Sequence, residues 1–397
     1  MSDIISKIKD LSDKHYGSVL AIRRHLHANP ELSFNEFETA NFIEAELKKL
    51  GIEHFERKAE TGITFMLEGG EDNGNVIALR ADIDALPIIE ANDVPYKSKN
   101  EGVMHACGHD VHTSSLLGAI MILNEIKDQF KGKIKIIFQP GEEKLPGGAS
   151  LLIKEGVLEN PKPSRILGQH VMPFIDSGKV GFRKGMYMAS ADEIYFTVKG
   201  KGGHAAMPEN IIDPVLITSH IIVALQQIVS RRSSPKIPSV LSFGDVHANG
   251  ATNVIPDEVK VKGTFRTYDE EWRAEAHKIM TEMAEGIAKS MGAECDFDVQ
   301  KGYPHLKNHP EYTQFNMDKA KEYLGEENVE EIDLWLAGED FAFYSHHVDA
   351  CFYRLGTRNE SRGIVSGVHT PTFDIDEDAL KVGMGLMSWL AVSELNK

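Results

Sequence analysis

The stretch VIALRADID, residues 76–84, places a short apolar run directly before two aspartates. The same order of apolar run and polar cluster recurs in IKIIFQPGEE, residues 134–143, and in ILGQH, residues 166–170. Helical patterns lie around 112–128 and 148–155, and residues 17–50 predict one helix that ends at Gly51. Strands that alternate with helices are typical of βαβ units, so the sequence predicts an α/β fold with a mostly parallel sheet.

Residues 188–302 follow a different order of elements. The strand-like EIYFTVKG precedes Asp213-Pro214, which suits the start of a helix that continues through Val229. Strand patterns at 239–246 and 258–267 precede a helix that begins at Asp269 and stops at Gly292, and CDFDV follows. The order β-α-β-β-α-β is that of a ferredoxin-like α+β domain. Since α/β texture resumes at about 303, we predict that 188–302 is inserted into a larger domain made of 1–187 and 303–397.

Composition restricts the class of partner and the compartment. The 397 residues carry a formal net charge of −17, which argues against nucleic acid and anionic membrane surfaces as partners. The N-terminal segment lacks the basic and apolar regions of a secretory signal, and no later apolar run is long enough to span a bilayer. Three cysteines, Cys107, Cys295 and Cys351, make a disulfide framework improbable, so we expect a cytoplasmic protein.

The polar clusters behind the strands are candidates for one site, because ligands bind beyond the carboxyl ends of parallel strands. The densest cluster is His105-Ala106-Cys107-Gly108-His109-Asp110-Val111-His112. In an extended segment Cys107 and His109 would point the same way, and thiolate and imidazole suit Zn²⁺, whereas carboxylates from elsewhere would also suit Mn²⁺. Two alternatives are a His-rich loop beside a buried free cysteine, and a Cys nucleophile with a His base.

Adjacent Glu142 and Glu143 offer the two carboxylate functions that metal-assisted hydrolysis needs, a ligand and a general base. Alone, such a pair is usually a solvated surface pair, but this one directly follows an apolar strand and a Pro-Gly turn. Asp82 and Asp84 could equally be loop or helix-capping aspartates. His170 and His369 also occur as lone hydrogen-bonded histidines in many proteins, and spacing alone does not assign them.

The segment Lys199–Ala206, KGKGGHAA, is a Gly-rich loop that carries His204. It lacks the G-K-[ST] ending of a phosphate-binding loop, so a nucleotide site is unsupported. A surface hairpin tip is the simplest interpretation of this segment.

Taken together, these motifs resemble metallopeptidase family 20, subfamily D, which includes aminoacylases, hippurate hydrolases, N-acetyldiaminopimelate deacetylases and auxin-conjugate hydrolases. The resemblance runs nearly end to end. Its motifs are RRHLHANPELSFNEFET (23–39), LRADIDALPI (79–88), MHACGHDVHT (104–113), FQPGEE (138–143), GQHVMP (168–173), KGKGGHAAMP (199–208), TNVIP (252–256), GTFRT (263–267), GEDFAFY (338–344) and GVHTPTF (367–373).

The resemblance implies a site with two divalent metal ions and Glu142 as general base. The implied ligands are Cys107, His109, Glu143, His170 and His369. Relatives outside the subfamily have an H-x-D pair where this chain has Asp82-Ile83-Asp84, which suggests that Asp82 or Asp84 orients a ligand instead of binding metal. Zn²⁺ or Mn²⁺ are the expected ions, with Co²⁺ and Ni²⁺ as further candidates.

The resemblance also implies that 188–302 is a lid through which subunits form a homodimer or a higher oligomer. His204, Asn253 and Arg266 match substrate-contacting positions, with His204 as an oxyanion donor. Arg266, or the backbone near Gly338, would hold the substrate carboxylate.

The predicted function is hydrolysis of the amide bond of N-acyl amino acids by a metal-activated water. Alternatives are a dipeptidase or carboxypeptidase that uses the same site, and a catalytically inactive binding protein of this fold. A thiol hydrolase acting through Cys107 would be sensitive to alkylation but not to chelators.

Overall fold

The computed structural model describes residues 2–397, and the chain divides into two compact units. Unit 1 comprises the residues up to Tyr187 together with Lys307–Leu334 and Asp340–Lys397. Unit 2 comprises Met188–Leu306 and the short segment Trp335–Glu339, which contains Gly338. Among residues 2–397, none of the helices combines the length and apolar character needed to cross a bilayer.

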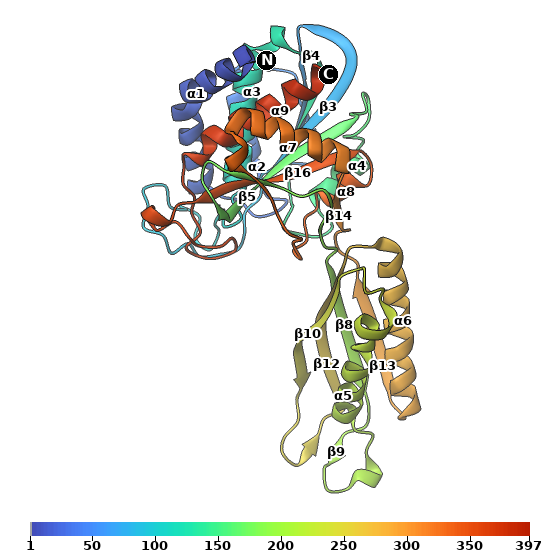
Figure 1. The fold of residues 1–397 in the computed structure, drawn as a ribbon. Helices are drawn as coiled ribbons and strands as arrows, with labels where there is room; N and C mark the ends of the chain where they lie inside the picture. The colour runs from blue at the N-terminus through green and yellow to red at the C-terminus, as the bar shows by residue number, and fades with distance from the viewer. Residues whose placement is uncertain (1) are drawn as a thin grey trace. The chain divides into compact units, whose positions relative to one another are not determined.

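Unit 1 is built on an eight-stranded sheet whose centre is parallel (Figure 1). In spatial order the strands are β1 (Glu56–Lys58), β2 (Gly62–Glu68), β4 (Lys131–Gln139), β3 (Glu71–Asp82), β5 (Arg165–Asp176), β16 (Asp349–Arg358), β6 (Val180–Phe182) and β15 (Val329–Glu331). The four central strands β4, β3, β5 and β16 run parallel to one another, whereas β2 and β6 pair antiparallel with the outer two of them. This sheet confirms the predicted α/β fold with a mostly parallel sheet.

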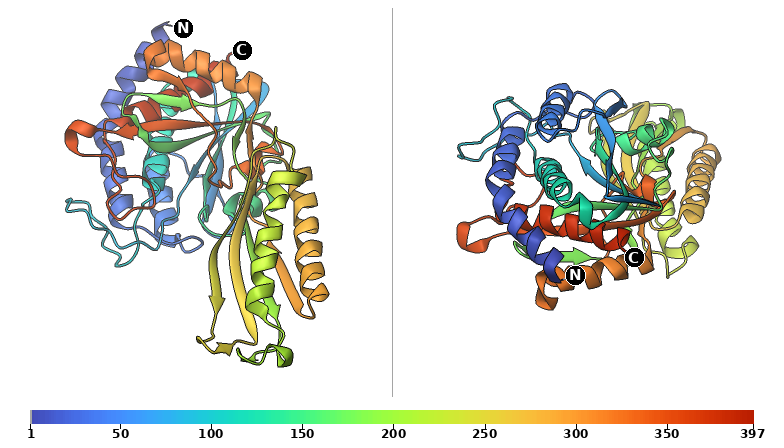
Figure 2. Two further views of the ribbon diagram at one scale, coloured as in Figure 1. Left: turned by 60° about the horizontal axis from the view of Figure 1, so that its bottom comes forward. Right: turned by 90° about the horizontal axis from the view of Figure 1, so that it is seen from above.

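Helices supply the apolar surface against which the sheet packs. Helices α3 (His109–Glu125) and α9 (Ala379–Leu395) contact each other, and α1 (Ser2–Ala28) contacts both (Figure 2). Nearly every residue of α3 and α9 is buried, so these two helices lie in the core. The remaining helices of unit 1 are α2 (Phe37–Lys49), α4 (Gly148–Lys154), α7 (Pro310–Leu324) and α8 (Ala342–Ser345).

The prediction of one helix over residues 17–50 was wrong. The first helix ends at Ala28, and α2 begins only at Phe37. The cause is Asn29-Pro30, because proline has no N–H to donate and disfavours helical geometry in the residue before it. The connection thus formed, residues 29–36, lies against the candidate site described below.

Unit 2 has the predicted β-α-β-β-α-β order. Its elements are β8 (Asp192–Lys199), α5 (Pro214–Leu225), β10 (Ser239–Ala248), β12 (Glu258–Thr267), α6 (Glu270–Ser290) and β13 (Glu294–Gln300). The strands pair antiparallel in the order β10-β12-β8-β13. Asp213 and Asp269 cap the two helices by accepting backbone N–H groups, as their positions in the sequence predict. A small ladder of β9 (Gly203–His204) and β11 (Val254–Ile255) belongs to the same unit.

Candidate metal centre

The five predicted metal ligands lie together in unit 1, at the ends of neighbouring elements. His170 lies in β5, Glu143 follows β4, and His369 lies in the loop before α9. The backbone N–H of His369 donates to the carbonyl of Ala106 at 2.8 Å, which holds His369 beside Cys107. Chain segments more than 200 residues apart therefore meet at one place.

The turn between Cys107 and His109 differs from the expected extended segment, so that prediction was wrong. Gly108 has φ +80°, in the left-handed region, and His109 is already the first residue of α3. A Cβ atom on Gly108 would lie 2.6 Å from Cγ2 of Val171, so only glycine fits this turn without displacing a neighbour. The turn brings both side chains to the same site by a sharp bend instead of by strand alternation.

Two overlapping groups of ligand atoms share the thiol of Cys107. One is Cys107, His109 and His170, and the other is Cys107, Glu143 and His369, with the ligand atoms of each group within 4.8 Å of one another. The Sγ atom of Cys107 lies 3.4 Å from Nε2 of His170 and 3.3 Å from Nε2 of His369. Nε2 of His369 lies 3.1 Å from Oε1 of Glu143. A thiolate common to two groups is suited to bridge two cations.

Hydrogen bonds leave the correct atoms free for a cation. Nδ1 of His170 lies 2.7 Å from the carbonyl oxygen of Val171, and Nδ1 of His109 lies 3.1 Å from Oδ1 of Asp84. Each Nδ1 therefore donates a hydrogen bond, which directs each Nε2 toward the shared site, where a cation could take the place of a proton. Among residues 2–397, the buried Nε2 of His109 has no hydrogen-bond partner, and the buried Oε1 of Glu143 has the His369 ring nearby but no well-formed hydrogen bond, a state that a bound cation would relieve.

His112 belongs to the cluster but has no free nitrogen. Its Nε2 accepts the backbone N–H of Val171 at 2.9 Å, and its Nδ1 lies 2.6 Å from Oδ1 of Asp82. This pattern fixes a neutral ring that donates to Asp82. We therefore interpret His112 as a support for the site and not as a ligand.

The charges of the site also favour a cation. Burial alone would lower the pKa of His109, but Asp82 and Asp84 outweigh it and raise that pKa to about 10. Burial raises the pKa of the Cys107 thiol well above its ordinary value, and the nearby Glu143 and Glu142 raise it further. A nucleophilic cysteine needs the opposite shift, so these surroundings argue against the thiol-hydrolase alternative.

Asp84 and Asp82 have different neighbours. Oδ1 of Asp84 accepts a hydrogen bond from Nδ1 of His109. Its Oδ2 accepts the hydroxyl of Ser33 at 2.6 Å and the backbone N–H of Glu143 at 3.0 Å. Oδ2 of Asp82 instead accepts Nη1 of Arg80 at 2.7 Å and lies 3.6 Å from Nε2 of His109. Asp84 is thus the carboxylate that contacts two predicted ligand residues through hydrogen bonds.

Glu142 is buried next to the predicted ligands. Its Oε2 lies 4.0 Å from Nε2 of His109, and its Oε1 accepts the backbone N–H of Asp340 at 3.3 Å. A carboxylate at this place can reach a water molecule held between the ligands without itself binding metal.

The four predicted residues of unit 2 form two separate pairs. His204 and Asn253 lie together, because the carbonyl of Asn253 accepts the N–H of Ala205 at 3.1 Å and β9 pairs with β11. Arg266 lies at the far end of β12, where its Nη1 donates to the carbonyl of Leu336 at 3.4 Å and would be 3.7 Å from a Cβ on Gly338. The nine residues of β12 from Glu258 to Arg266 span about 27 Å, which is eight steps along the strand. One small substrate therefore cannot contact both pairs of the same unit 2.

Each pair has donors suited to an anion. Nδ1 of His204 accepts the N–H of Ala206 at 3.1 Å, so the ring carries its proton on Nε2, which is then a donor. Arg266 is half-buried, and it donates to neutral oxygens, the hydroxyl of Thr264 at 3.3 Å and the carbonyl of Leu336 at 3.4 Å.

The sequence motifs also contain supporting residues that had no predicted role. Ser33 and Glu36 lie in the motif 23–39, Arg80 lies in the motif 79–88 and Asp340 in the motif 338–344. All four are buried polar residues, yet nothing in local spacing says which distant groups they bind.

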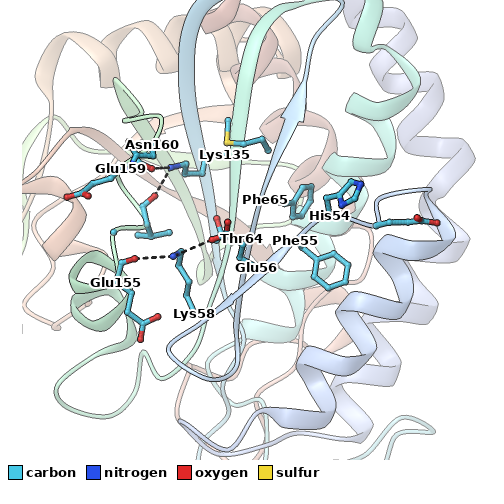
Figure 3. Close-up of a pocket in the computed structure, with 14 residues that line it drawn as sticks. His54, Phe55, Glu56, Lys58, Thr64, Phe65, Lys135, Glu155, Glu159 and Asn160 are labelled. Atoms are coloured by element: carbon cyan, nitrogen blue, oxygen red, sulfur yellow. Dashed lines mark hydrogen bonds and ion pairs between the residues drawn. The ribbon is translucent and has the colours of Figure 1, made fainter.

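A hollow of about 730 Å³ lies elsewhere in unit 1, along β1 and β2 (Figure 3). Lys135 borders it and donates to the carbonyls of Val157, Glu159 and Pro161 at 2.7–2.9 Å. These bonds use all three ammonium donors, and none of the predicted site residues lines the hollow. Lys135 therefore closes a loop and offers no donor to a ligand.

Comparisons with known proteins give one matching family, whose similar members include a deacetylase and a carboxypeptidase. Residues 78–392 match the family described as Peptidase family M20/M25/M40. An N-acetyl-L-cysteine deacetylase of Bacillus subtilis is 41% identical over 362 residues, covering 91% of this chain and 84% of the relative. Thermostable carboxypeptidase 2 of Saccharolobus solfataricus is 37% identical over 399 residues, covering 100% of this chain and 100% of the relative. The crystal structure of a Bacillus subtilis dinuclear metal-binding peptidase of the M20 family has a TM-score of 0.82 at 36% identity, covering 96% of this chain and 99% of that one.

Proposed function

Because the chain belongs to peptidase family M20/M25/M40, we propose that it is a metal-dependent amidohydrolase that cleaves N-acyl amino acids to a carboxylic acid and a free amino acid. Membership of the family agrees with the resemblance predicted from the motifs. The observation that carries the proposal is the pair of ligand groups that share Cys107, with Glu142 beside them.

We propose that the site binds two divalent ions, which Cys107, His109, His170, Glu143 and His369 would hold. The thiolate and imidazoles favour Zn²⁺, whereas the carboxylate and imidazoles also suit Mn²⁺, Co²⁺ or Ni²⁺. When bound, such ions lower the pKa of a water molecule and polarise a carbonyl oxygen.

Glu142 then performs the proton transfers of the reaction. Its carboxylate takes a proton from the attacking water as the water oxygen bonds to the acyl carbon. It gives that proton to the amide nitrogen as the C–N bond breaks, which releases the acid and the amine. Asp84 orients His109 throughout through the Nδ1 hydrogen bond.

The residues of unit 2 provide substrate recognition in this proposal. Arg266 and the backbone at Gly338 hold the carboxylate of the amino acid, a role supported by the hydrogen bonds of Arg266 to the neutral oxygens of Thr264 and Leu336. His204 donates from Nε2 to the oxyanion, with Asn253 beside it. Since β12 extends for about 27 Å from Arg266 to its other end at Glu258, we propose that each site receives His204 and Asn253 from a partner subunit.

Exposed apolar residues on unit 2 support a homodimer through this unit. On α5, Val215, Leu216 and Val223 are 38%, 52% and 73% exposed. Strand β10 lies at the edge of the sheet, where its backbone groups can pair with another strand. A second copy of the chain, joined at β10 and α5, would cover both features.

A hydrolysis screen tests the proposed function. The purified chain, stripped with a chelator and reloaded with Zn²⁺, Mn²⁺, Co²⁺ or Ni²⁺, is incubated with N-acetyl and N-benzoyl amino acids and with dipeptides. We expect metal-dependent release of free amino acid, fastest from the N-acyl compounds. Faster cleavage of dipeptides would favour the carboxypeptidase alternative, and activity unaffected by chelation would refute the proposal.

A further inference from the structure

The connection between α1 and α2, residues 29–36, contacts the candidate metal centre through Asp84, a carboxylate that is hydrogen-bonded to predicted ligand residues. It exists because Asn29-Pro30 ends α1, and it carries part of a motif to which the proposed reaction gives no role. Ser33 is 7% exposed and Glu36 is fully buried. Polar side chains so deeply buried are costly unless they are hydrogen-bonded, so their partners are informative.

Ser33 is linked to two predicted metal ligands through a single carboxylate. Its hydroxyl donates to Oδ2 of Asp84 at 2.6 Å. The same Oδ2 atom also accepts the backbone N–H of Glu143 at 3.0 Å. The other oxygen of Asp84, Oδ1, accepts a hydrogen bond from Nδ1 of His109 at 3.1 Å. Rotation of the Asp84 carboxylate would therefore turn the His109 ring and release the backbone of Glu143.

Glu36 fixes the connection on which Ser33 lies. Its Oε1 accepts the backbone N–H of Phe34 and of Gly141, both at 2.8 Å, and its Oε2 accepts the hydroxyl of Thr61 at 2.8 Å. The Phe34 ring occupies the space that a Cβ on Gly141 would need, at 2.3 Å. The connection is thus held to the turn that precedes Glu142, and Ser33 cannot move away from Asp84 independently of that turn.

We propose that Ser33 is a positioning residue of the metal centre, acting through Asp84 on His109 and Glu143. The inference rests on the proposed function in that it requires the site to bind divalent metal. The Ser33 hydroxyl restricts the Asp84 carboxylate to the orientation in which His109 presents its Nε2 lone pair to the shared site. Loss of hydrogen-bond partners behind metal ligands typically weakens metal binding about 10–100-fold.

The test measures metal affinity directly, without substrate. The metal-free full chain is titrated with Zn²⁺ in competition with a chromogenic chelator, for the wild type, Ser33→Ala and Ser33→Thr. The control is Ser388→Ala, which removes an equally buried hydroxyl whose bond, to the carbonyl of Met384 at 2.8 Å, lies inside α9. Asp84→Asn, alone and combined with Ser33→Ala, completes a double-mutant cycle.

We expect Ser33→Ala to raise the dissociation constant about 10-fold or more, and Ser33→Thr, which keeps the hydroxyl, to remain within about 3-fold of the wild type. Ser388→Ala should leave the constant unchanged. In the Asp84→Asn background, Ser33→Ala should add less than about 2-fold, because its route to the ligands is already broken. Equal affinities of Ser33→Ala and Ser388→Ala would overturn the inference, as would full additivity in the cycle. A wild type that takes up no metal would instead refute the proposed function.

Discussion

Replacement of Glu142 by glutamine separates proton transfer from metal binding. Glu142 is 6% exposed and accepts a long 3.3 Å hydrogen bond from the backbone of Asp340 on Oε1. Glutamine has nearly the same shape and keeps a carbonyl oxygen for that bond, but its amide nitrogen cannot accept a proton. Glu142 lies outside the two groups that share Cys107 but forms a further candidate group with His109 and Glu143; since glutamine keeps a carbonyl oxygen and the other ligands are unchanged, the variant should retain both metal ions.

The two expected effects differ in size. A neutral side chain that keeps a long hydrogen bond should change the free energy of unfolding by less than about 1 kcal/mol. General-base catalysis contributes about 10²–10⁴-fold, which corresponds to about 2.7–5.4 kcal/mol in the activation free energy. The increase in the activation free energy should therefore be several times larger than the change in the free energy of unfolding.

The assay compares initial rates on an N-acetyl amino acid with metal content determined by elemental analysis. Glu143→Gln serves as the contrasting variant, since it alters a proposed ligand and should lose metal together with activity. A Glu142→Gln enzyme that keeps more than a tenth of wild-type kcat would show that another group takes the proton, and Asp84 would be the next candidate. Loss of metal from Glu142→Gln would move that residue into the ligand set.

Three further predictions concern unit 2 and its role. Mixing His204→Ala with Glu142→Gln under conditions of subunit exchange should restore part of the activity, because mixed dimers contain one site with both residues intact; no recovery despite proven exchange would place His204 in its own subunit's site. Arg273→Ala removes the guanidinium partner of the fully buried Asp192 carboxylate, which retains contacts with His277 and the backbone N–H of Gly302, so denaturant unfolding should show a loss of about 3 kcal/mol, and a loss below about 1 kcal/mol would contradict this. Burial would raise the pKa of Glu270, but hydrogen bonds from His305 and Arg273 lower it from 4.5 to about 2. A depressed folded-state pKa stabilises the protein above pH 4.5 and loses that contribution between about pH 4.5 and 2, so Glu270→Gln should flatten the acid-induced loss of stability in this range.

Several features of the fold followed directly from local patterns. Apolar runs followed by carboxylates at 76–84 and 134–143 are β3 and β4, and both clusters lie at the same edge because parallel strands end together. The capping aspartates Asp213 and Asp269 also occur at the predicted helix starts. These features depend on residues close in the chain or on strand direction, which sequence patterns report well.

Other features depend on contacts that no local pattern contains. The helical periodicity of 17–50 masked the break at Asn29-Pro30, and with it the connection that carries Ser33. The difference between Asp82 and Asp84 arises from partners such as Arg80 and His112, which spacing alone cannot pair. The separation of His204 from Arg266 depends on which strands neighbour each other in the sheet of unit 2.

The discontinuity of unit 1 has a consequence for biosynthesis. Strand β5 lies between β3, which is made early, and β16, which is made after all of Met188–Leu306. In a nascent chain, the largely buried strand β5 therefore has one unpaired edge until β16 is made. The sheet of unit 2 can already form, because its four strands lie in one continuous stretch of the sequence. The edge of β5 that later pairs with β16 stays open during this interval, so a chain ending after Leu306 should aggregate although its small sheet is complete.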